Sequence, residues 1–315
     1  MEVAKIDLRG LNPSSPGWGK ACAAVTASMV AHGCVVVVHD AISPELRQAV
    51  FDRAMPQLFA FPVETKQQNV SSVTALKGYI SKVPGADFES FNVNKVDEAR
   101  SFHDFSNIFW PQGNPEFSNT IGALARKVIE LEDMVEKMTL VGLGVREENI
   151  ASHLHALTHV LRLSHYCVPE DAKMGVTLPA HTDPSLITAL VQHEVEGLEV
   201  QTKDGRWIAI PPEADTITFM AGDLLTLITN GRVAASVHRV KTLSNRERYA
   251  ILCASSVKNS VAISVMDEFV DHGNPPKYNS VKTDEYLEFR YSGEGFKSSQ
   301  PLEEYCGVHK CGSTE

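Results

Sequence analysis

The chain has little cysteine and no long apolar run. Its six cysteines are spread over 315 residues and form no Cys-x-x-Cys pair, so a disulfide framework is not indicated. No apolar stretch reaches the roughly 18 residues of a membrane span. The N-terminus also lacks the basic and apolar segments of a secretory signal. We therefore expect a cytoplasmic protein that does not enter a membrane.

Positive charge is scarce as well. The sequence has 29 Lys and Arg against 39 Asp and Glu, which gives a formal charge of -10. Nucleic-acid binding needs a basic face, so the charge argues against that class of partner. The hydrophobic fraction of 43% and the charged fraction of 22% are those of an ordinary globular protein.

Several catalytic motifs are missing. There is no phosphate loop of the Gly-x-x-x-x-Gly-Lys type and no Gly-x-Ser-x-Gly nucleophile elbow. Three Gly-x-Gly pairs lack the third glycine of a dinucleotide fingerprint: Gly17-Trp-Gly19, Gly142-Leu-Gly144 and Gly293-Glu-Gly295. Nucleotide chemistry and serine hydrolysis are therefore not supported.

The first half of the chain predicts mixed structure. Helical spacing of apolar residues covers 16–32, and Cys34 to Val38 is typical of a buried strand. Ser43 and Pro44 have the pattern of a helix start, and Pro56 should kink or end that helix. The segment 71–115 is expected to be irregular, and a long helix is predicted over 119–143.

After about residue 157 the pattern changes to short strands with turn signals between them. Eight or nine strands at close spacing indicate a sandwich or barrel. The predicted strands are 157–166, 186–192, 198–202, 206–210, 216–220, 224–229, 237–240, 248–257 and 261–265. A helix is expected again near 283–291. We interpret the chain as one catalytic unit, 1–315, with a helical and mixed region 1–156, a β core 157–265 and a helical region 266–315.

One histidine motif indicates a metal site. His181 and Asp183 form the single His-x-Asp of the chain, and residues two apart on a strand point to the same side. His238 lies in a later strand pattern and can supply a third ligand. Two histidines and a carboxylate on one face form the ligand set of non-haem Fe(II) oxygenases. Arg248, on the next predicted strand, needs a partner if buried, and a dicarboxylate would supply one.

The other histidines give weaker evidence for a functional site. His153, His155, His159 and His165 lie where a helix passes into a strand. The pair His155 and His159 has metal-helix spacing but lacks the glutamate of a metalloprotease motif. We expect this group to be structural, and Cys253 to be an inert core thiol.

The combined pattern resembles the plant 2-oxoglutarate- and Fe(II)-dependent dioxygenases. The family's His-Thr-Asp, His-Arg-Val and Arg-x-Ser motifs match His181-Thr-Asp183, His238-Arg-Val and Arg248-Tyr-Ala250. Segments 161–166 and 197–205 are most similar to the branch that contains the glucosinolate side-chain-modifying dioxygenases. The resemblance covers nearly the whole chain. It implies a mainly β fold with flanking helices, in which an isopenicillin N synthase-like double-stranded β-helix, or jelly roll, forms the core.

The resemblance also implies residue roles. His181, Asp183 and His238 would bind Fe(II), and Arg248 would pair with the C5 carboxylate of 2-oxoglutarate, with Tyr166 hydrogen-bonding this co-substrate. Two residues depart from the family pattern: Ala250 replaces the serine of Arg-x-Ser, and Ser164 replaces an asparagine. A lost charge-assisted hydrogen bond is worth roughly 1.5–3 kcal/mol, which puts the affinity for 2-oxoglutarate in question.

The expected activity is the hydroxylation, desaturation or cyclisation of a small specialised plant metabolite, with release of succinate and CO2. O2 is the oxidant, and ascorbate could serve as reductant. The alternatives are an iron oxidase of the same fold that does not use 2-oxoglutarate, favoured by Ala250, and a small-molecule binder with a vestigial triad. We expect a monomer. Expected substrate contacts come from Phe88, Phe102, Phe105 and Phe289, with Phe91, Tyr286, Phe296, Leu161, Leu178, Pro184, Leu186 and Val240 as further candidates.

Overall fold

Two β-sheets form the centre of the molecule. The computed structural model describes residues 2–70, 78–81, 88–168, 175–242, 245–258 and 261–308. The larger sheet has eight strands, in the order β1 (Lys5–Asp7), β2 (Cys34–Val38), β10 (Thr216–Ala221), β7 (Ile187–Gln192), β12 (Arg248–Val257), β5 (Leu157–Tyr166), β4 (Phe88–Val93) and β3 (Tyr79–Ser81). The smaller sheet has four, in the order β6 (Gly175–His181), β11 (His238–Thr242), β8 (Leu198–Gln201) and β9 (Trp207–Ala209). The predicted mainly β, jelly-roll-like architecture with flanking helices is confirmed.

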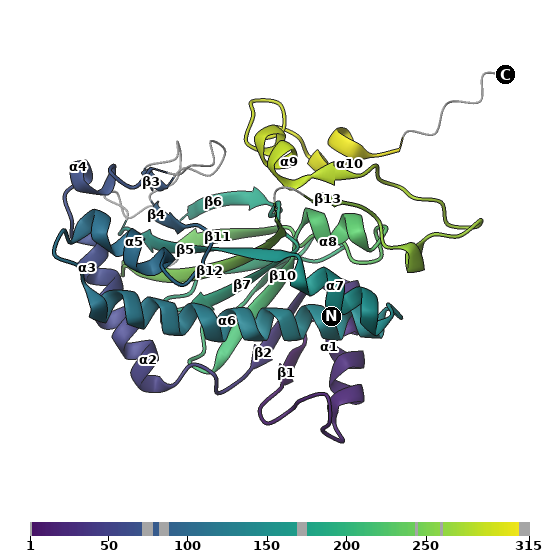
Figure 1. The fold of residues 1–315 in the computed structure, drawn as a ribbon, viewed down its shortest axis with the longest axis horizontal. Coiled ribbons are helices and arrows are strands. Elements are labelled where there is room, and N and C mark those ends of the chain that lie inside the picture. Colours follow the sequence, from purple (N-terminus) through teal and green to yellow (C-terminus); the bar gives the residue numbers. More distant parts are fainter. Residues whose placement is uncertain are drawn as a thin grey trace.

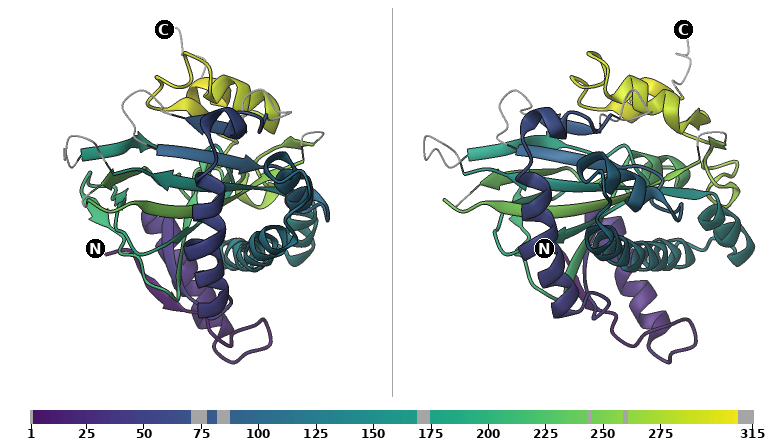
Figure 2. Two further views of the ribbon diagram at one scale, coloured as in Figure 1. Left: turned by 90° about the vertical axis from the view of Figure 1, so that its left-hand side faces the viewer. Right: turned by 60° about the vertical axis from the view of Figure 1, so that its left-hand side comes forward.

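Helices cover the outside of these sheets (Figure 1). They are α1 (Trp18–His32), α2 (Pro44–Gln48), α3 (Met55–Phe59), α4 (Val63–Lys66), α5 (Ser101–Phe109), α6 (Pro115–Gly142), α7 (Glu147–His155), α8 (Asp223–Ile228), α9 (Thr283–Arg290) and α10 (Pro301–Cys306). A 3-10 turn covers Asp267–Phe269. A separate two-stranded sheet consists of β13 (Ala262–Ile263) and β14 (Val281–Lys282). In Figures 1 and 2, α9 and α10 lie on one side of the strands, and α1, α2 and α6 lie on the other.

The apolar side chains form two separate cores because both faces of the large sheet are covered. The outer face packs against the helices, where Leu163 and Ile251 of the sheet join Ile121 and Val128 of α6. The inner face meets the small sheet. That inner core contains Val36, Leu190 and Met220 from the large sheet and Leu198, Val200 and Val240 from the small one. The polar site described below opens from this inner layer.

The N-terminal region contributes to the central sheet as well as to the cover. β2 pairs with β10, and β4 pairs with β5 through six residues, Phe88 opposite Tyr166 to Val93 opposite Leu161. Strands from before residue 157 therefore complete the sheet that carries the predicted 2-oxoglutarate residues.

Several local predictions are confirmed and some are wrong. α1 ends at Gly33, whose left-handed φ of 63° lets its N–H bond to the Met29 carbonyl. Ser43 caps α2 as predicted. The helix continues past Pro56, because a π-helical segment, Ala49–Ala54, leads into α3 with Pro56 in its first turn.

The predicted strand 224–229 is wrong: the segment is helix α8, and all six residues of α8 are buried. A short apolar run that is buried on every side carries no period to separate helix from strand. The irregular segment expected over 71–115 also contains β4 and α5 in its described part. Among the described residues, none of the helices is both long and apolar enough to cross a bilayer.

Candidate active site

Two neighbouring strands of the small sheet bring the two predicted histidines together. His181 ends β6, His238 begins β11, and the two residues are paired in register, with ring centroids 4.3 Å apart. Asp183 follows β6, and its carboxylate oxygens lie 3.6 Å from His181 Nε2 and 3.8 Å from His238 Nε2. The predicted triad is therefore assembled, with its three ligand atoms within 4.8 Å of one another.

The hydrogen bonds of the triad suit a metal. His181 Nδ1 donates to the Pro179 carbonyl at 2.8 Å, and His238 Nδ1 donates to the Ser236 carbonyl at 3.0 Å. Both Nε2 atoms are thereby left as lone-pair donors that face Asp183. Asp183 Oδ2 is buried and has no hydrogen-bond partner in the described part of the chain. A divalent cation between these three atoms would satisfy it.

The electrostatics favour the protonation states that bind metal. Burial, together with the nearby His238, lowers the pKa of His181 to about 4. Burial acts to raise the pKa of Asp183, but the two histidines outweigh it and lower this pKa below its usual range. Neutral imidazole and ionised carboxylate are the forms that coordinate a cation.

A buried polar group holds the turn that carries Asp183. The backbone N–H of Asp223, at the start of α8, donates to the Asp183 carbonyl at 2.8 Å. Tyr286 Oη donates to Asp223 Oδ2 at 2.7 Å, and Arg290 Nη2 donates to the Thr182 carbonyl at 3.1 Å. Burial raises the pKa of Asp223 to about 6. Helix α9, which belongs to the C-terminal region of the chain, therefore holds the His-x-Asp turn in place through Tyr286 and Arg290.

Arg248 lies at the start of β12 and points into the space between the sheets. It is 1% exposed, and its Nη2 donates to Gln192 Oε1 at 2.9 Å. Its Nε and Nη1 have no hydrogen-bond partner among the residues described. The guanidinium carbon lies 4.7 Å from the ring centroid of Tyr166. A buried guanidinium with two unsatisfied nitrogens is costly without an anion, and burial lowers its pKa.

The predicted co-substrate residues form a row beside this guanidinium. Tyr166 is opposite Arg248 in the β5–β12 pair, and Ser164 is opposite Ala250. Gln192 of β7 is opposite Ala250 on its other side. Gly197 makes room for Arg248, because a Cβ there would lie 2.9 Å from Nε. The sheet register thus collects Tyr166, Ser164, Ala250 and Arg248 on one inner surface.

A cavity adjoins Asp183 at the other end of this surface. Apolar side chains form part of its wall. The polar lining residues are Asn92, Arg162, Asp183, Ser185, Thr188, Ser255 and Ser256. The apolar wall consists of Val160, Pro184, Leu252, Ala254, Leu287 and Tyr291. A substrate in this cavity would lie against the triad.

The aromatic residues expected to bind substrate lie away from this cavity. Phe102 and Phe105 of α5 are buried in the helix-side core, where Phe105 packs on Phe117. Phe88 stacks on Tyr166 in the inner core, and Phe289 packs on Tyr305. Their contact with substrate stays a prediction. Of the other expected contacts, Pro184 lines the cavity. Phe91, Leu161 and Leu186 lie in the helix-side core, and Val240 lies in the inner core with Leu178 packed against it. Tyr286 is fully buried, whereas Phe296 is 68% exposed.

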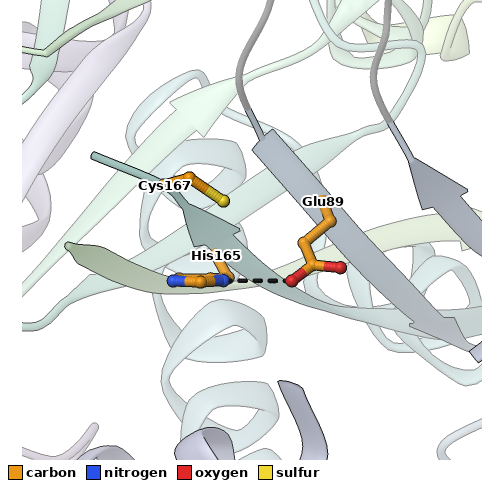
Figure 3. Close-up of side chains that lie close together, drawn as sticks. All are labelled: Glu89, His165 and Cys167. Atoms are coloured by element: carbon orange, nitrogen blue, oxygen red, sulfur yellow. Dashed lines mark hydrogen bonds and ion pairs between the residues drawn. The ribbon is translucent and has the colours of Figure 1, made fainter. Parts of the chain in front are cut away.

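A second group of possible metal ligands lies on the outer face of β4 and β5. Glu89, His165 and Cys167 come close together there, with Glu89 Oε1 3.1 Å from His165 Nδ1 (Figure 3). Lys66 Nζ lies 2.8 and 3.0 Å from the two carboxylate oxygens, and Tyr79 Oη donates to one of them at 2.6 Å. These bonds lower the pKa of Glu89 to about 2 against the effect of burial. The Lys66 ammonium already supplies a positive charge beside this carboxylate.

Two of the other histidines expected to be structural are paired with carboxylates. His153 Nε2 lies 2.6 Å from Glu136 Oε1, and His159 Nδ1 lies 2.8 Å from Asp97 Oδ1. Glu132 of α6, fully buried nearby, has no hydrogen-bond partner for either carboxylate oxygen in the described structure. Burial raises the pKa of Glu132 to about 8.

Sequence reasoning missed Arg162, Asn92, Gln192 and Arg290. Arg162 carried the same signal as Arg248, an arginine inside a strand pattern, and so could have been found. Gln192 and Asn92 reach the site only through sheet pairing, and Arg290 only through the packing of α9.

Two family models and several known dioxygenases match this chain. Residues 157–255 match the family model of the 2OG-Fe(II) oxygenase superfamily, and residues 3–111 match the non-haem dioxygenase N-terminal region described for morphine synthesis. The chain is 34% identical over 296 residues to a probable 2-oxoglutarate-dependent dioxygenase AOP1 of Arabidopsis thaliana, covering 92% of this chain and 96% of the relative. It is 26% identical to the 2-oxoglutarate-dependent dioxygenase AOP3 of the same plant, with 95% of each chain covered.

Solved structures share the fold. The rice dioxygenase for auxin oxidation superposes with a TM-score of 0.82 at 23% identity, covering 97% of this chain and all of the other. JOX2, solved in complex with 2OG, Fe and JA, superposes with a TM-score of 0.81 at 22% identity, covering 98% of this chain and 90% of the other.

Proposed function

The chain belongs to the 2OG-Fe(II) oxygenase superfamily, and from this premise we propose that it oxidises a small specialised plant metabolite while converting 2-oxoglutarate to succinate and CO2. Hydroxylation is the simplest outcome, with desaturation and ring closure as variants. The observation that carries the proposal is the buried Arg248, whose unsatisfied guanidinium shares one inner surface with Tyr166 and Ser164.

In this proposal His181, Asp183 and His238 hold Fe(II). Bound iron, together with 2-oxoglutarate and O2, supplies the oxidising chemistry that the protein itself lacks. Two histidines and one carboxylate are a ligand set that would leave coordination positions of a bound ion open to small molecules. The Nδ1 bonds of the two histidines to backbone carbonyls keep their rings oriented toward the metal.

Arg248 binds the C5 carboxylate of 2-oxoglutarate in this proposal. Its Nε and Nη1 are free to donate, and Gln192 orients the guanidinium through Nη2. A carboxylate would accept a paired hydrogen bond and neutralise the buried charge. Ser164 and Tyr166 offer further hydroxyl groups on the same surface, whereas Ala250 contributes only a methyl group.

The walls of the cavity exclude water and position the substrate. Leu252 and Ala254 come from β12, and Leu287 and Tyr291 come from α9 and the residue after it. Apolar walls beside the metal ligands favour reaction with the substrate over reaction with water.

One observation favours a second function. Ala250 lacks the hydroxyl that the family motif places beside Arg248, and an iron oxidase that does not use 2-oxoglutarate would not need it. The unsatisfied nitrogens of Arg248 argue for 2-oxoglutarate instead, because an enzyme without this co-substrate would keep a buried charge with no anion.

The test is succinate formation by the purified protein with Fe(II), 2-oxoglutarate and O2, screened against plant metabolites. We expect succinate in proportion to product, and we expect His181→Ala to lose both Fe(II) binding and turnover. Product formed without succinate would support the second function. Unchanged Fe(II) affinity in His181→Ala would contradict the triad, and light scattering would test the expected monomer.

A further inference from the structure

The cavity beside Asp183 contains a cation, Arg162, that forms no ion pair with a described carboxylate and acts on Asp183 only at longer range. Arg162 projects from β5, and its Nε donates to Asn92 Oδ1 at 3.0 Å. Its two terminal nitrogens make no hydrogen bond to the residues described, and no described carboxylate lies within ion-pair distance of 4.0 Å. The guanidinium is therefore oriented by one amide, and Arg162 lines the cavity.

Arg162 is distinct from the arginine assigned to 2-oxoglutarate. Residues 162, 164 and 166 of β5 share one face, and Tyr166 is opposite Arg248. Arg162 lies four residues further along, opposite Leu252 and Asn92. At about 3.3 Å per residue, the two arginine positions are roughly 13 Å apart along the strand. The inner surface thus offers two separate sites for an anion.

The charges show why the second anion is needed. With both histidines neutral, Fe(II) and Arg248 together balance Asp183 and the two carboxylates of 2-oxoglutarate. Asp223 and Arg290 lie 3.7 Å apart and offset each other. Lys66 and Glu89 are paired on the outer face of the sheet. Arg162 therefore remains as a positive charge without an ion-paired carboxylate among the described residues, in a half-buried cavity where a single negative charge is favoured.

We infer that Arg162 binds the carboxylate of the substrate, and that the substrate is a small monocarboxylic acid with an apolar body. The planar fork of arginine matches the two oxygens of a carboxylate. Leu252, Ala254 and Leu287 would contact the apolar part. This inference rests on the proposed function, because it assigns the cavity to the substrate of that reaction. It narrows the substrate from any small metabolite to an acid held at one end beside the metal.

Binding without turnover tests the inference. The protein is loaded anaerobically with Fe(II) and 2-oxoglutarate and titrated in a calorimeter with three acids and their primary amides: phenylacetate, 3-phenylpropanoate and 4-phenylbutanoate. A charge-assisted hydrogen bond of about 1.5–3 kcal/mol corresponds to roughly 10- to 100-fold in affinity. We expect at least one acid to bind the wild type tighter than its amide by that factor. Arg162→Gln should lose this preference, and Arg162→Lys should keep only part of it.

Two controls make the result specific. Arg206→Gln alters an exposed arginine that pairs with Asp204 on a turn, and it should behave as the wild type. Arg162→Gln should bind Fe(II) and 2-oxoglutarate with unchanged affinity, which also shows that it is folded.

Three outcomes would overturn the inference: amides that bind the wild type as tightly as acids, no binding by any of the acids, or an acid preference that survives Arg162→Gln. If Arg162→Gln does not fold, Arg162→Lys is the deciding variant. Full retention of the preference for acids over amides in Arg162→Lys would contradict a bidentate interaction of the carboxylate with the guanidinium. Failure of the wild type to bind 2-oxoglutarate would count against the proposed function, and the contrast between acid and amide would still report on Arg162.

Discussion

Ala250 stands directly opposite Ser164 in the antiparallel pair of β12 and β5, two residues along from the buried Arg248. Gln192 of β7 faces Ala250 from the other side. Both neighbours carry polar side chains, and Ala250 itself is fully buried. The methyl group at 250 therefore interrupts a polar row beside the guanidinium that we assign to 2-oxoglutarate.

Ala250→Ser should strengthen the binding of 2-oxoglutarate. The added hydroxyl would lie beside Arg248 and donate to the same carboxylate, which is worth roughly 1.5–3 kcal/mol, or about 10- to 100-fold in affinity. Calorimetric titration with 2-oxoglutarate would measure it, with the melting temperature as a check on folding. A weaker affinity in a folded variant would show that the co-substrate bonds elsewhere, through Ser164 or Tyr166.

Gly197→Ala should weaken 2-oxoglutarate binding while leaving Fe(II) binding intact. A Cβ at 197 would lie 2.9 Å from Arg248 Nε and 3.2 Å from Val240 Cγ1, so the guanidinium must shift. Loss of one charge-assisted bond would cost about 1.5–3 kcal/mol, or roughly 10- to 100-fold in affinity. Gly19→Ala is the matched control, because a Cβ there meets nothing within 4 Å. Equal 2-oxoglutarate affinity in both variants would contradict this role of Gly197.

Tyr286→Phe should weaken Fe(II) binding without touching a ligand. It removes the hydrogen bond to Asp223, whose backbone N–H holds the Asp183 carbonyl. Changes to the groups that orient metal ligands typically cost about 10- to 100-fold in affinity. Competition with a fluorescent chelator would measure the change.

Tyr305→Phe provides the control, since the Tyr305 hydroxyl makes no hydrogen bond to the residues described and its ring packs on that of Tyr286. A loss of Fe(II) affinity of equal size in both variants would assign the effect to ring packing instead of to the hydrogen bond.

Glu132→Gln should stabilise the protein above neutral pH. Burial raises the folded-state pKa of Glu132 from 4.5 to about 8. Over that window the folded protein keeps a proton that the unfolded chain releases, so folding takes up a proton and stability falls as pH rises. Glutamine carries no charge at any pH and removes this loss. Each kcal/mol gained raises the melting temperature of a large domain by roughly 2–4 °C.

Melting temperatures between pH 5 and pH 8.5 would test this. Glu130→Gln, an exposed position on the same helix that pairs with Lys127, should leave the slope unchanged. A slope in Glu132→Gln as steep as that of the wild type would show that other groups near Glu132, such as His159 and Glu136, carry the pH dependence.

Much of the site could be predicted because its residues carry their own local signals. His181 and Asp183 are two apart, which keeps them close together, although only His181 lies in a strand and Asp183 belongs to the turn after β6. Arg248 is conspicuous as a charge within a strand pattern, and its spacing from Ala250 places both on one face. The register of the sheets then confirmed that Ser164 and Tyr166 lie on that surface.

The substrate side of the site could not be predicted in this way. Phe102 and Phe105 are as apolar as any cavity wall, and only the packing of α5 on α6 shows that they fill the helix-side core. The strand prediction for segment 224–229 is wrong for a related reason, since burial on all sides removes the alternation that distinguishes a strand.

The sequence by itself determined the class of chemistry, because the ligand residues and the buried arginine are set by identity and short spacing. Only the tertiary structure decided which groups surround them. Asn92 and Arg162 meet through the pairing of β4 with β5, and α9 reaches the His-x-Asp turn from about one hundred residues away, with Arg290 bonded to the Thr182 carbonyl. Contacts between segments so distant follow from the packing of whole sheets and helices, and no local pattern in the chain encodes them.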